Sequence, residues 1–490
     1  MASLWLIFGA IAAALLILRS ILKKVNWFLY EASLGDKQYS LPPGDMGWPI
    51  IGNMWSFLRA FKSNAPDSFM DSIIKRFGNT GIYKVFMFGF PSVIVTSAEA
   101  CKKVLTDDEH FEPGWPQSTV ELIGEKSFIK MPFEEHRRLR RLTSASINGY
   151  EALSVYLKYI EEIVIESLEK WTQMGEIEFL TQMRKLTFKI IIHIFLGSES
   201  EPVMEALERE YTILNLGVRA MRINIPGFAF HKSLKARKNL VAIFQSIVDK
   251  RRDERKGKKP VPGQKAKDMM DSLVDAVDEN GRKLDDDEII DIMLMYLNAG
   301  HESSGHITMW ATYFLQRHPE FFRKAKEEQV EMLKRRPPSQ KGLKLEEVRK
   351  MEYLSKVIDE TMRVVTFSLM VFRQARADVK VNGYLIPKGW RVLTWFRSVH
   401  FDSELYPDPR EFNPENFSMV RKAGEFLPFG AGTRLCPGND LAKLEISVFL
   451  HHFLLKYELE QLNPKSPIRF LPHTRPMDNC LARIKKQEAA

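Results

Sequence analysis

The stretch that most constrains this chain is FGAGTRLCPG, residues 429–438, where one cysteine stands between a glycine-rich turn and a helix. The run that starts at Leu441 is apolar at helical spacing, and Asn439 or Asp440 is expected to cap its first turn. A helix N-terminus stabilises a thiolate through its dipole and its free backbone N–H groups. The stretch therefore predicts a stabilised thiolate at Cys436, although a lone cysteine in a loop is more often an inert buried residue.

Neighbouring residues of the turn favour a flat, anionic ligand beside the sulfur. Pro437 has no N–H, so backbone donors to the sulfur must come from Gly438 onward. Gly430 and Gly432 lack a side chain, which lets the backbone lie close to a flat group. Arg434 is placed to pair with a carboxylate on that group.

The complete spacing F-x-x-G-x-R-x-C-x-G resembles the haem-binding signature of the cytochrome P-450 monooxygenases. The resemblance implies a haem b cofactor whose iron takes the Cys436 thiolate as its axial ligand, which promotes cleavage of the O–O bond. It also implies haem contacts from Phe429, Arg434 and Gly438. Because the resemblance covers essentially the whole chain, we expect the fold of that family, mainly α-helical with a small β-rich portion, behind an N-terminal anchor helix.

The longest apolar helical pattern, residues 291–315, has the sequence NAGHESSGH at its centre. Ala299 and Gly300 suit a groove for dioxygen beside the helix, although Gly weakens a helix interior by roughly 1 kcal/mol relative to Ala. Glu302 and Ser303 resemble the acid–alcohol pair of the family, whose implied role is proton delivery during catalysis. On their own these residues would suit a tolerated glycine with a surface acid and hydroxyl, and the cysteine motif makes the catalytic interpretation the stronger one.

Two arginines are assigned to haem propionates by the resemblance. Residues 134–142 place His136 and Arg140 one helical turn apart, where the family commonly has Trp-x-x-x-Arg. We therefore expect a propionate contact from Arg140, with His136 in the place of the tryptophan. Arg373 ends the segment FSLMVFR, which matches the segment that lines the substrate pocket and supplies another propionate ligand.

The pair Glu360 and Arg363, three residues apart on a helix, resembles the Glu-x-x-Arg that holds the core beneath the haem. Most members add a second arginine from a Pro-Glu-Arg-Phe motif. Here that motif reads PENF, with Asn416 in place of the arginine. Glu360 would keep a single cationic partner, so we expect weaker haem retention. The histidines at 301 and 306 are expected to be packing or surface residues rather than metal ligands.

The composition of the chain limits the kinds of partner that it is expected to bind. The chain has 490 residues, a net charge of +9 and three widely separated cysteines, which suggests neither a disulfide framework nor a zinc site. A basic balance fits an anionic membrane surface or an acidic protein, and we find no nucleic-acid-binding module. No flavin or nicotinamide domain is visible, so the resemblance implies that a separate NADPH-cytochrome reductase supplies the electrons.

The N-terminal run Leu4–Leu22 is apolar except for Arg19 and Ser20, and as a helix it would span roughly 28 Å. Positive charge follows the run, which places the bulk of the chain in the cytosol. We expect a single-pass anchor at 1–24, a Pro/Gly-rich connector at 25–53 and a catalytic domain at 54–490. The resemblance implies the endoplasmic reticulum membrane.

Coarse periodicity predicts several elements. Residues 82–97 read as a hairpin around a Gly-Phe-Pro turn. Helices are expected over residues 150–171, 179–196 and 234–250, and an exposed, charged loop over 251–268. Strands with intervening turns are expected in the segments VKVNGYLIPKGWRVLTW and RPMDNCLARI.

Several segments, including PGWPQSTVELIGEKSF and LPHTRPMDNCLARI, resemble plant members of the family that oxidise a hydrophobic diterpenoid acid in successive steps to an early gibberellin. A buried substrate carboxylate would need a cation. Arg219, Arg222 and Lys126 are candidates, and each reads equally well as a solvated charge. Two alternatives are a triterpenoid oxidase of the β-amyrin type and a non-catalytic, membrane-anchored haem protein.

Overall fold

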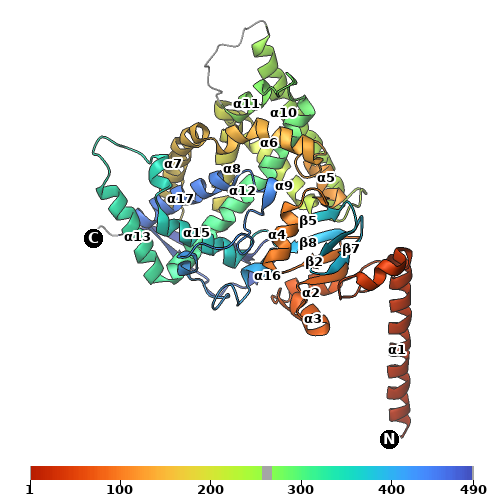
Figure 1. The fold of residues 1–490 in the computed structure, drawn as a ribbon. Coiled ribbons are helices and arrows are strands. Elements are labelled where there is room, and N and C mark those ends of the chain that lie inside the picture. The colour runs from red at the N-terminus through yellow and green to blue at the C-terminus, as the bar shows by residue number, and fades with distance from the viewer. Residues whose placement is uncertain (1, 257–267, 488–490) are drawn as a thin grey trace. The chain divides into compact units, whose positions relative to one another are not determined.

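The computed structural model describes residues 2–256 and 268–487. The chain divides into two compact units. One, here called the sheet unit, comprises residues 1–114 and 369–399, and the other, the helical unit, comprises residues 115–368 and 400–490. Figure 1 shows the labelled elements of both.

The sheet unit is built on one five-stranded sheet of order β1-β2-β8-β5-β3, in which only the β2–β8 pair is parallel. β6 and β7 form a separate two-stranded antiparallel sheet in the same unit. The strands are β1 (Ile82–Met87), β2 (Phe90–Val95), β3 (Phe111–Pro113), β5 (Met370–Ala375), β6 (Val379–Val381), β7 (Tyr384–Ile386) and β8 (Arg391–Trp395). The helices are α1 (Ala2–Tyr30), the 3-10 helix η1 (Ala32–Ser40), α2 (Met54–Lys62), α3 (Ser68–Phe77) and α4 (Ala98–Thr106).

The predicted hairpin over residues 82–97 is confirmed, because β1 and β2 pair antiparallel from Ile82–Val95 to Met87–Phe90. The turn itself is Phe88-Gly89, one residue earlier than expected, and both residues have positive φ. Glycine adopts that conformation at little cost, which explains why the chain reverses there. The predicted turn at Asn382-Gly383 likewise joins β6 to β7.

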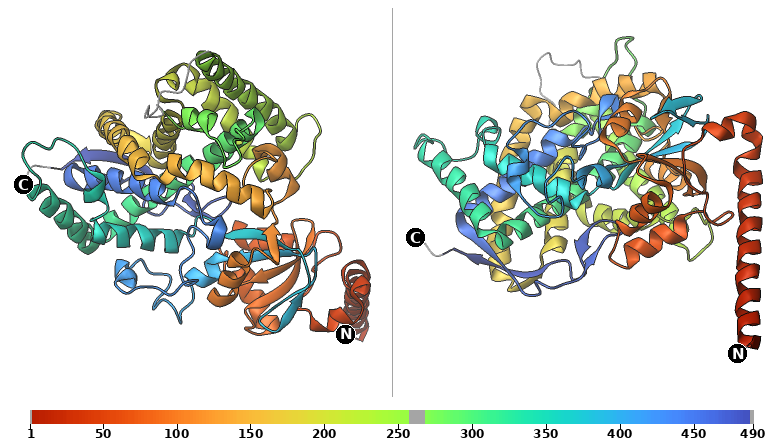
Figure 2. Two further views of the ribbon diagram at one scale, coloured as in Figure 1. Left: turned by 45° about the horizontal axis from the view of Figure 1, so that its top comes forward. Right: turned by 60° about the horizontal axis from the view of Figure 1, so that its bottom comes forward.

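The helical unit has its longest helix, α12 (Asp286–Arg317), packed against α8, α15 and α17, as Figure 2 lets the reader follow. An Asp285–Glu288 capping box fixes the start of α12. The other helices are α5 (Gln117–Ile123), α6 (Phe133–Asn148), α7 (Tyr150–Gln173), α8 (Phe179–Leu196), α9 (Met204–Val218), α10 (Ala229–Arg255), α11 (Met269–Asp275), α13 (Pro319–Lys334), α14 (Leu345–Val348), α15 (Glu352–Val365) and α17 (Asn439–Lys456); α16 (Phe396–His400) lies at the boundary of the two units.

Short strands and 3-10 helices complete the helical unit. A three-stranded sheet has the order β4-β12-β9, and β10 pairs with β11. These strands are β4 (Glu176–Glu178), β9 (Tyr457–Gln461), β10 (Ile468–Arg469), β11 (Arg475–Pro476) and β12 (Leu481–Lys486), and the 3-10 helices are η2 (Gly197–Glu199), η3 (Glu201–Val203), η4 (Pro414–Phe417) and η5 (Gly432–Arg434). The mainly helical fold with a small β-rich portion is therefore confirmed.

One sequence expectation was wrong. The charged stretch 251–268 was predicted to be an exposed loop, but α10 continues to Arg255, and Arg251 and Asp268 are buried. The reason is mutual pairing: Arg251 Nη2 lies 2.9 Å from Asp268 Oδ2 and 2.8 Å from Glu199 Oε2. Charges that satisfy one another in this way tolerate burial. Residues 257–267 lie outside those that the structure describes.

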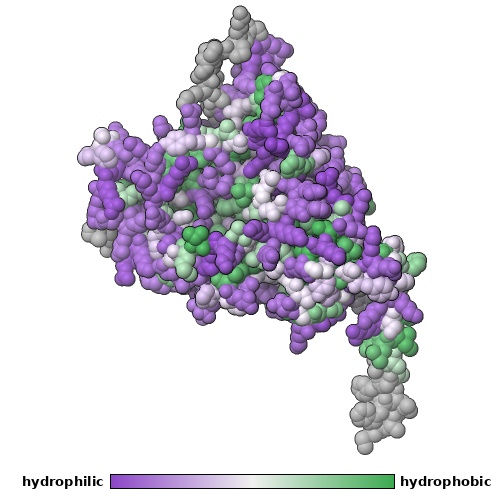
Figure 3. Space-filling view, viewed as in Figure 1, coloured by the Kyte–Doolittle hydropathy of each residue, from purple (hydrophilic) through white to green (hydrophobic). Residues whose placement is uncertain are grey.

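The predicted anchor falls in α1, where Leu15, Leu16 and Ile17 are exposed. Figure 3 shows part of this segment as green, hydrophobic surface. Among residues 2–256 and 268–487, no helix combines the length and the hydropathy needed to cross a membrane. The C-terminal end of α1 is fixed to the connector by Asn26, whose side-chain amide donates to the Gly47 carbonyl at 2.6 Å.

Candidate functional site

Cys436 lies in the tight turn between η5 and α17. Its backbone N–H donates to the Phe429 carbonyl at 3.0 Å, and Gly430 and Gly432 adopt positive φ to make that closure possible. The Gly438 N–H donates to the sulfur, as the missing N–H of Pro437 predicts. Burial raises the pKa of the Cys436 thiol, whereas the Gly438 N–H and the charge of Arg140 oppose the rise.

The expected side-chain cap of α17 was wrong. The helix begins at Asn439, its N-cap position is Gly438, and no side chain caps it. The Asn439 side-chain oxygen instead accepts from Asn148 Nδ2 of α6 at 3.1 Å. That contact ties the start of α17 to α6, the helix that also carries Arg140.

Arg140 is a half-buried cation near the sulfur. Its guanidinium makes no hydrogen bond or ion pair with any residue that the structure describes, although its charge acts on Cys436 and on Tyr296 of α12. Arg434 is held differently, because it donates to the carbonyls of Phe128 at 3.2 Å and Met131 at 2.9 Å. Of the two arginines, Arg140 is thus the better placed to accept an anionic partner.

Helix α12 is buried along nearly its whole length but has one accessible stripe at its centre. Asn298, Ala299, Gly300 and Ser303 form this stripe, with buried residues on either side of them in the sequence. Ser303 Oγ donates to the Ala299 carbonyl at 2.9 Å, so the hydroxyl lies along the stripe. Ala299, Gly300 and the Ser303 hydroxyl line most of this face beside the Asn298 amide, and the small residues suit close approach by a ligand.

These features fit a flat, dianionic prosthetic group such as haem. The Cys436 thiol accepts a hydrogen bond from a backbone N–H and lies near the positive charge of Arg140. Arg140 itself has no hydrogen-bond or ion-pair partner among the described residues. Helix α12 adds an accessible stripe that contains Ala299 and Gly300. Tyr296 links the three regions, because both Cys436 and Arg140 act on its pKa and its hydroxyl donates to Thr143 of α6. The residues present are therefore those that a haem with a thiolate ligand requires.

Glu302, the predicted acid, is buried and turned toward a cluster of cations. Its Oε1 accepts from Arg184 of α8 at 2.6 Å and from the side-chain amide of Asn215 of α9 at 2.9 Å. Arg219 lies 3.6 Å from Oε2. Burial would raise the pKa of Glu302, but the neighbouring positive charges outweigh it and lower the pKa to about 2.

His473 joins this cluster, and sequence reasoning missed it. Its ring stacks on Phe367 with 3.9 Å between centroids, Nδ1 faces the Phe367 carbonyl at 3.3 Å, and Nε2 faces Arg219 Nη2 at 2.6 Å. Burial lowers the pKa of His473 well below its usual value. The imidazole is therefore neutral, donates from Nδ1 and accepts from Arg219 at Nε2.

His301 and His306 are packing residues, as expected. Their Nδ1 atoms face the carbonyls of Leu297 at 3.1 Å and Glu302 at 2.7 Å, and burial lowers both pKa values to about 4. Within the described residues no group of His, Cys, Asp and Glu side chains could hold a metal ion.

The Glu360–Arg363 pair of α15 is completely buried and bidentate, with both N···O distances at 2.7 Å. Asn416 donates to Glu360 Oε1 at 3.1 Å, so the amide takes the position of a missing cation. Arg421, not expected from the sequence, donates from Nε to the Asn416 carbonyl at 3.0 Å and lies over the Tyr406 ring. A second arginine thus holds the residue that contacts Glu360.

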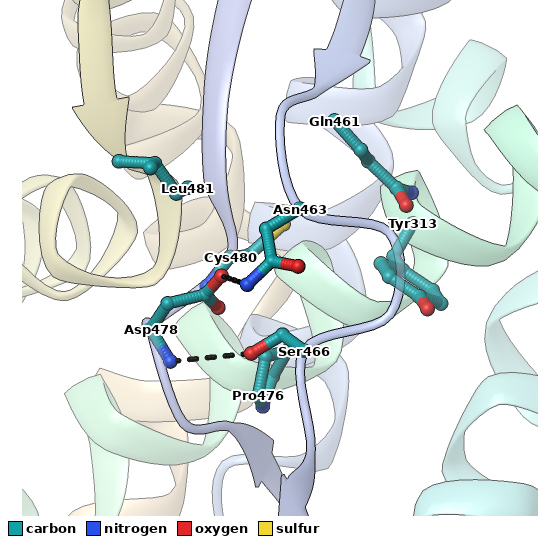
Figure 4. A pocket seen from close by; sticks show the side chains of 8 residues that line it. All are labelled: Tyr313, Gln461, Asn463, Ser466, Pro476, Asp478, Cys480 and Leu481. Atoms are coloured by element: carbon teal, nitrogen blue, oxygen red, sulfur yellow. Dashed lines mark hydrogen bonds between the residues drawn. The ribbon is translucent and has the colours of Figure 1, made fainter.

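The remaining candidates are scattered. Arg373 is a buried residue of β5 in the sheet unit, and its haem contact stays a prediction. Arg222 pairs with Glu121 at 2.5 Å, and Lys126 pairs with Asp285 at 2.9 Å. Figure 4 shows a small pocket elsewhere in the helical unit, which contains no cation and no predicted site residue; it is lined by Tyr313, Gln461, Asn463, Ser466, Pro476, Asp478, Cys480 and Leu481.

The chain is similar to known proteins over nearly its whole length. The family model described as Cytochrome P450 matches residues 42–479. Ent-kaurenoic acid oxidase 1 of Arabidopsis thaliana is 65% identical over 469 residues, which are 95% of this chain and 95% of that protein. Ent-kaurenoic acid oxidase of Oryza sativa subsp. japonica is 54% identical over 487 residues, with coverage of 99% and 96%.

A solved structure shows the same fold. Retinoic acid-bound cyanobacterial CYP120A1 aligns with a TM-score of 0.80 at 28% identity, over 91% of this chain and 99% of that one. Family model, relatives and fold are in agreement. The chain therefore belongs to the cytochrome P450 family of haem-thiolate monooxygenases.

Proposed function

We propose that this protein oxidises ent-kaurenoic acid in successive steps toward an early gibberellin. It uses dioxygen and electrons that NADPH supplies through a separate reductase. The observation that carries the proposal is the 65% identity to the Arabidopsis ent-kaurenoic acid oxidase 1 across 95% of both chains. The rice relative of the same description adds support at 54% identity. A triterpenoid substrate is not favoured, because relatives described as 7,8-epoxymelianol synthases are less similar, at 50% and 49% identity.

The proposed haem contacts follow from the geometry of the helical unit. Cys436 holds the iron through its sulfur, and the Gly438 N–H steadies the thiolate. Arg140 pairs with a propionate, because it has no other partner among the described residues. Bound haem supplies the dioxygen chemistry that inserts one oxygen atom into the substrate. Further contacts are assigned to Phe429, Arg434, Gly438, Ala299, Gly300 and Arg373.

Proton handling is assigned to the central turns of α12. Ser303 presents its hydroxyl on the accessible stripe, where it can hold or pass a proton at Oγ. Glu302 remains ionised between Arg184 and Arg219 and acts as an acceptor that orients its neighbours. Glu360 and Arg363 have a structural role beneath this region.

The proposed location of the protein in the cell is based on the sequence of α1 and on the hydrophobic character of the substrate. We assign residues 1–24 to a single-pass anchor in the endoplasmic reticulum membrane, 25–53 to a connector and 54–490 to a catalytic domain in the cytosol. The apolar residues of α1 and the basic residues Arg19, Lys23 and Lys24 support this assignment. A hydrophobic acid would reach such an enzyme from the lipid, and the net charge of +9 suits an acidic reductase surface.

The test is reconstitution of the full-length protein with an NADPH-dependent reductase. Ent-kaurenoic acid should give products that carry successive oxygen additions, identified by mass spectrometry, and β-amyrin should give none. Cys436→Ala serves as the inactive control. A haem-loaded protein that leaves ent-kaurenoic acid unchanged and oxidises β-amyrin would contradict the proposal.

A further inference from the structure

Three cations were candidates to hold a substrate carboxylate, and the structure separates them by their partners. Arg222 pairs with Glu121, with 2.5 Å between Nη2 and Oε1. Lys126 pairs with Asp285, with 2.9 Å between Nζ and Oδ2. Each of these two charges is already neutralised by a carboxylate at hydrogen-bond distance. The third candidate, Arg219, has no carboxylate oxygen at that distance within the part of the chain that the structure describes.

Arg219 directly follows α9 and is held by two neutral acceptors. Its Nη1 donates to the side-chain oxygen of Asn215 at 3.1 Å, and its Nη2 lies 2.6 Å from Nε2 of His473. The His473 ring is itself fixed by stacking on Phe367. These contacts use two of the five N–H donors of the guanidinium, so they orient the group without neutralising its charge. Because the Arg219 side chain is 38% exposed, a ligand can reach the remaining donors.

Positive charge exceeds negative charge around Arg219. Glu302 accepts from Arg184 at 2.6 Å, whereas its other oxygen is 3.6 Å from Arg219. Arg475 of β11 adds a further cation. Burial lowers the pKa of Arg475, and so do two neighbouring arginines, one of which is Arg184. The carboxylates of Glu302 and Glu178 oppose that fall only in part. The arginines that act on one another here outnumber the carboxylates, so an additional anion is stabilised at this position.

This excess of positive charge adjoins the accessible stripe of α12. Residues three and four apart share a face of a helix, so Glu302 lies on the same side of α12 as Asn298 and Ala299. Arg219 approaches that side through Glu302. Helix α9 also reaches the stripe through Tyr211, whose hydroxyl donates to the Asn298 side-chain oxygen at 3.5 Å. A ligand that contacts Arg219 with one end can therefore lie along the stripe with the other.

We propose that Arg219 binds the carboxylate of the substrate acid and thereby sets which carbon atoms of the substrate face the stripe of α12. A guanidinium can offer two parallel N–H groups to a carboxylate, which gives the contact both strength and direction. Arg184 neutralises most of the charge of Glu302, so that this acid orients Arg219 without occupying its remaining donors. The inference rests on the proposed function, because ent-kaurenoic acid is the acid that it concerns.

The first test compares two ligands on the unmodified, full-length ferric holoprotein. Ent-kaurenoic acid and its primary amide have nearly the same size, but only the acid carries a negative charge at pH 7. The optical shift of the haem should give a Kd for the acid that is about 10-fold or more below the Kd for the amide, because the amide forms no charge-assisted pair. Equal Kd values would overturn the proposal. This comparison needs no variant, so it decides the matter even if a substitution prevents haem uptake.

The second test assigns the preference to Arg219. Arg219→Gln should raise the Kd for the acid by roughly 10-fold or more and change the Kd for the amide by less than about 2-fold. Arg219→Lys keeps the charge but loses the two-pronged contact, and its Kd for the acid should lie between those of Arg219→Gln and the unmodified protein. The control Arg222→Gln removes a positive charge from the same segment, at an arginine that is already paired, and should bind the acid normally. An unchanged Kd for the acid in Arg219→Gln, or an equal loss for acid and amide, would overturn the proposal.

The third test measures orientation during turnover with an NADPH-dependent reductase. Arg219→Gln should oxidise ent-kaurenoic acid at more positions than the unmodified enzyme does, since one end of the substrate is no longer held. Mass spectrometry of the products identifies these positions. The same product pattern in both proteins would show that Arg219 does not orient the substrate.

These measurements separate the role of Arg219 from the proposed function. If the unmodified holoprotein shows the optical shift with ent-kaurenoic acid but no preference over the amide, the role of Arg219 is overturned and the proposed function stands. If the haem-loaded protein shows no shift with ent-kaurenoic acid, the proposed function is overturned, and this inference with it.

Discussion

Glu302 of α12 and Glu445 of the neighbouring helix α17 are buried to nearly the same degree, at 6% and 4% exposure, yet their pKa values differ widely. Glu302 is contacted by Arg184 and lies near Arg219, and its pKa falls to about 2. No cation among the described residues acts on Glu445, and burial raises its pKa to about 8. Burial raises the pKa in both cases, so the cations make the difference. The protonation state of a buried acid is set by its partners more than by its depth.

The largest effect is expected from Cys436→Ala, which removes the proposed iron ligand. Product formation should fall to background, because no other described residue offers a thiolate to this site. Product assays on the haem-loaded preparation check this. Full turnover by this variant would remove Cys436 from the site.

Removing a cation that lies beside Glu302 should raise the pKa of Glu302 toward that of Glu445. Breaking a fully buried pair costs about 3–5 kcal/mol. The Arg184 side chain is 33% exposed, so solvent screening reduces the expected loss for Arg184→Ala to about 2 kcal/mol at pH 7. Denaturant unfolding measures this change, with Arg184→Lys as the control that keeps the charge.

The pH dependence gives the sign of the Glu302 contribution. Its folded pKa of about 2 lies below an unfolded value of about 4.3, so its stabilisation is present above about pH 4.3 and is lost as pH falls toward 2. In Arg184→Ala the acid-induced loss of stability should be shallower. An acid profile identical to that of the unmodified protein would show that Arg184 does not set the acidity of Glu302.

Glu445 should show the opposite dependence. Its folded pKa of about 8 exceeds the unfolded value, so its stabilisation is present below about pH 4.3 and is lost progressively until pH passes 8. Glu445→Gln is neutral at every pH and escapes that loss. Its stability relative to the unmodified protein should therefore rise between pH 5 and 8, by up to about 3 kcal/mol. A constant difference across this range, measured by denaturant unfolding, would contradict the raised pKa.

The smallest effect is expected from a substitution beside a third buried carboxyl, that of Glu360. It already has a bidentate arginine and an amide donor from Asn416, and Arg421 holds the Asn416 carbonyl. Asn416→Arg should therefore change haem retention only slightly, by less than about 1 kcal/mol of binding, since the site is already satisfied. Haem loss to an acceptor protein measures this. A large gain in retention would show that the amide is an inadequate substitute for the usual arginine.

Much of the site was predictable because its information is local. The turn around Cys436 is specified by consecutive glycines and a proline, and the stripe of α12 by adjacent small residues. The predicted side-chain cap of α17 was wrong because the Asn439 side chain accepts a hydrogen bond from Asn148, almost 300 positions away in the sequence. The partners of Glu302 come from three separate segments, α8, α9 and the loop that contains His473. Long-range contacts of this kind leave no local pattern.

Glu445 illustrates the same point. A single carboxylate in the apolar run LAKLEISVFLHHF was a visible signal, because charged residues are seldom fully buried without a partner. Its raised pKa depends on burial without a cation beside it, where α17 packs against α12 and other helices, and only the structure shows this. The expectation of exposure was wrong at the two ends of the stretch 251–268 for a related reason, since Arg251 and Asp268 pair with one another and are buried.

The central claim is that a haem held by Cys436 lies beside the site where ent-kaurenoic acid binds. Titration of the purified ferric protein with ent-kaurenoic acid, followed at the Soret band, tests this most directly. We predict a saturable low-spin to high-spin shift, because the acid displaces the water bound to iron. A protein with full haem content that shows no shift with ent-kaurenoic acid would contradict the account.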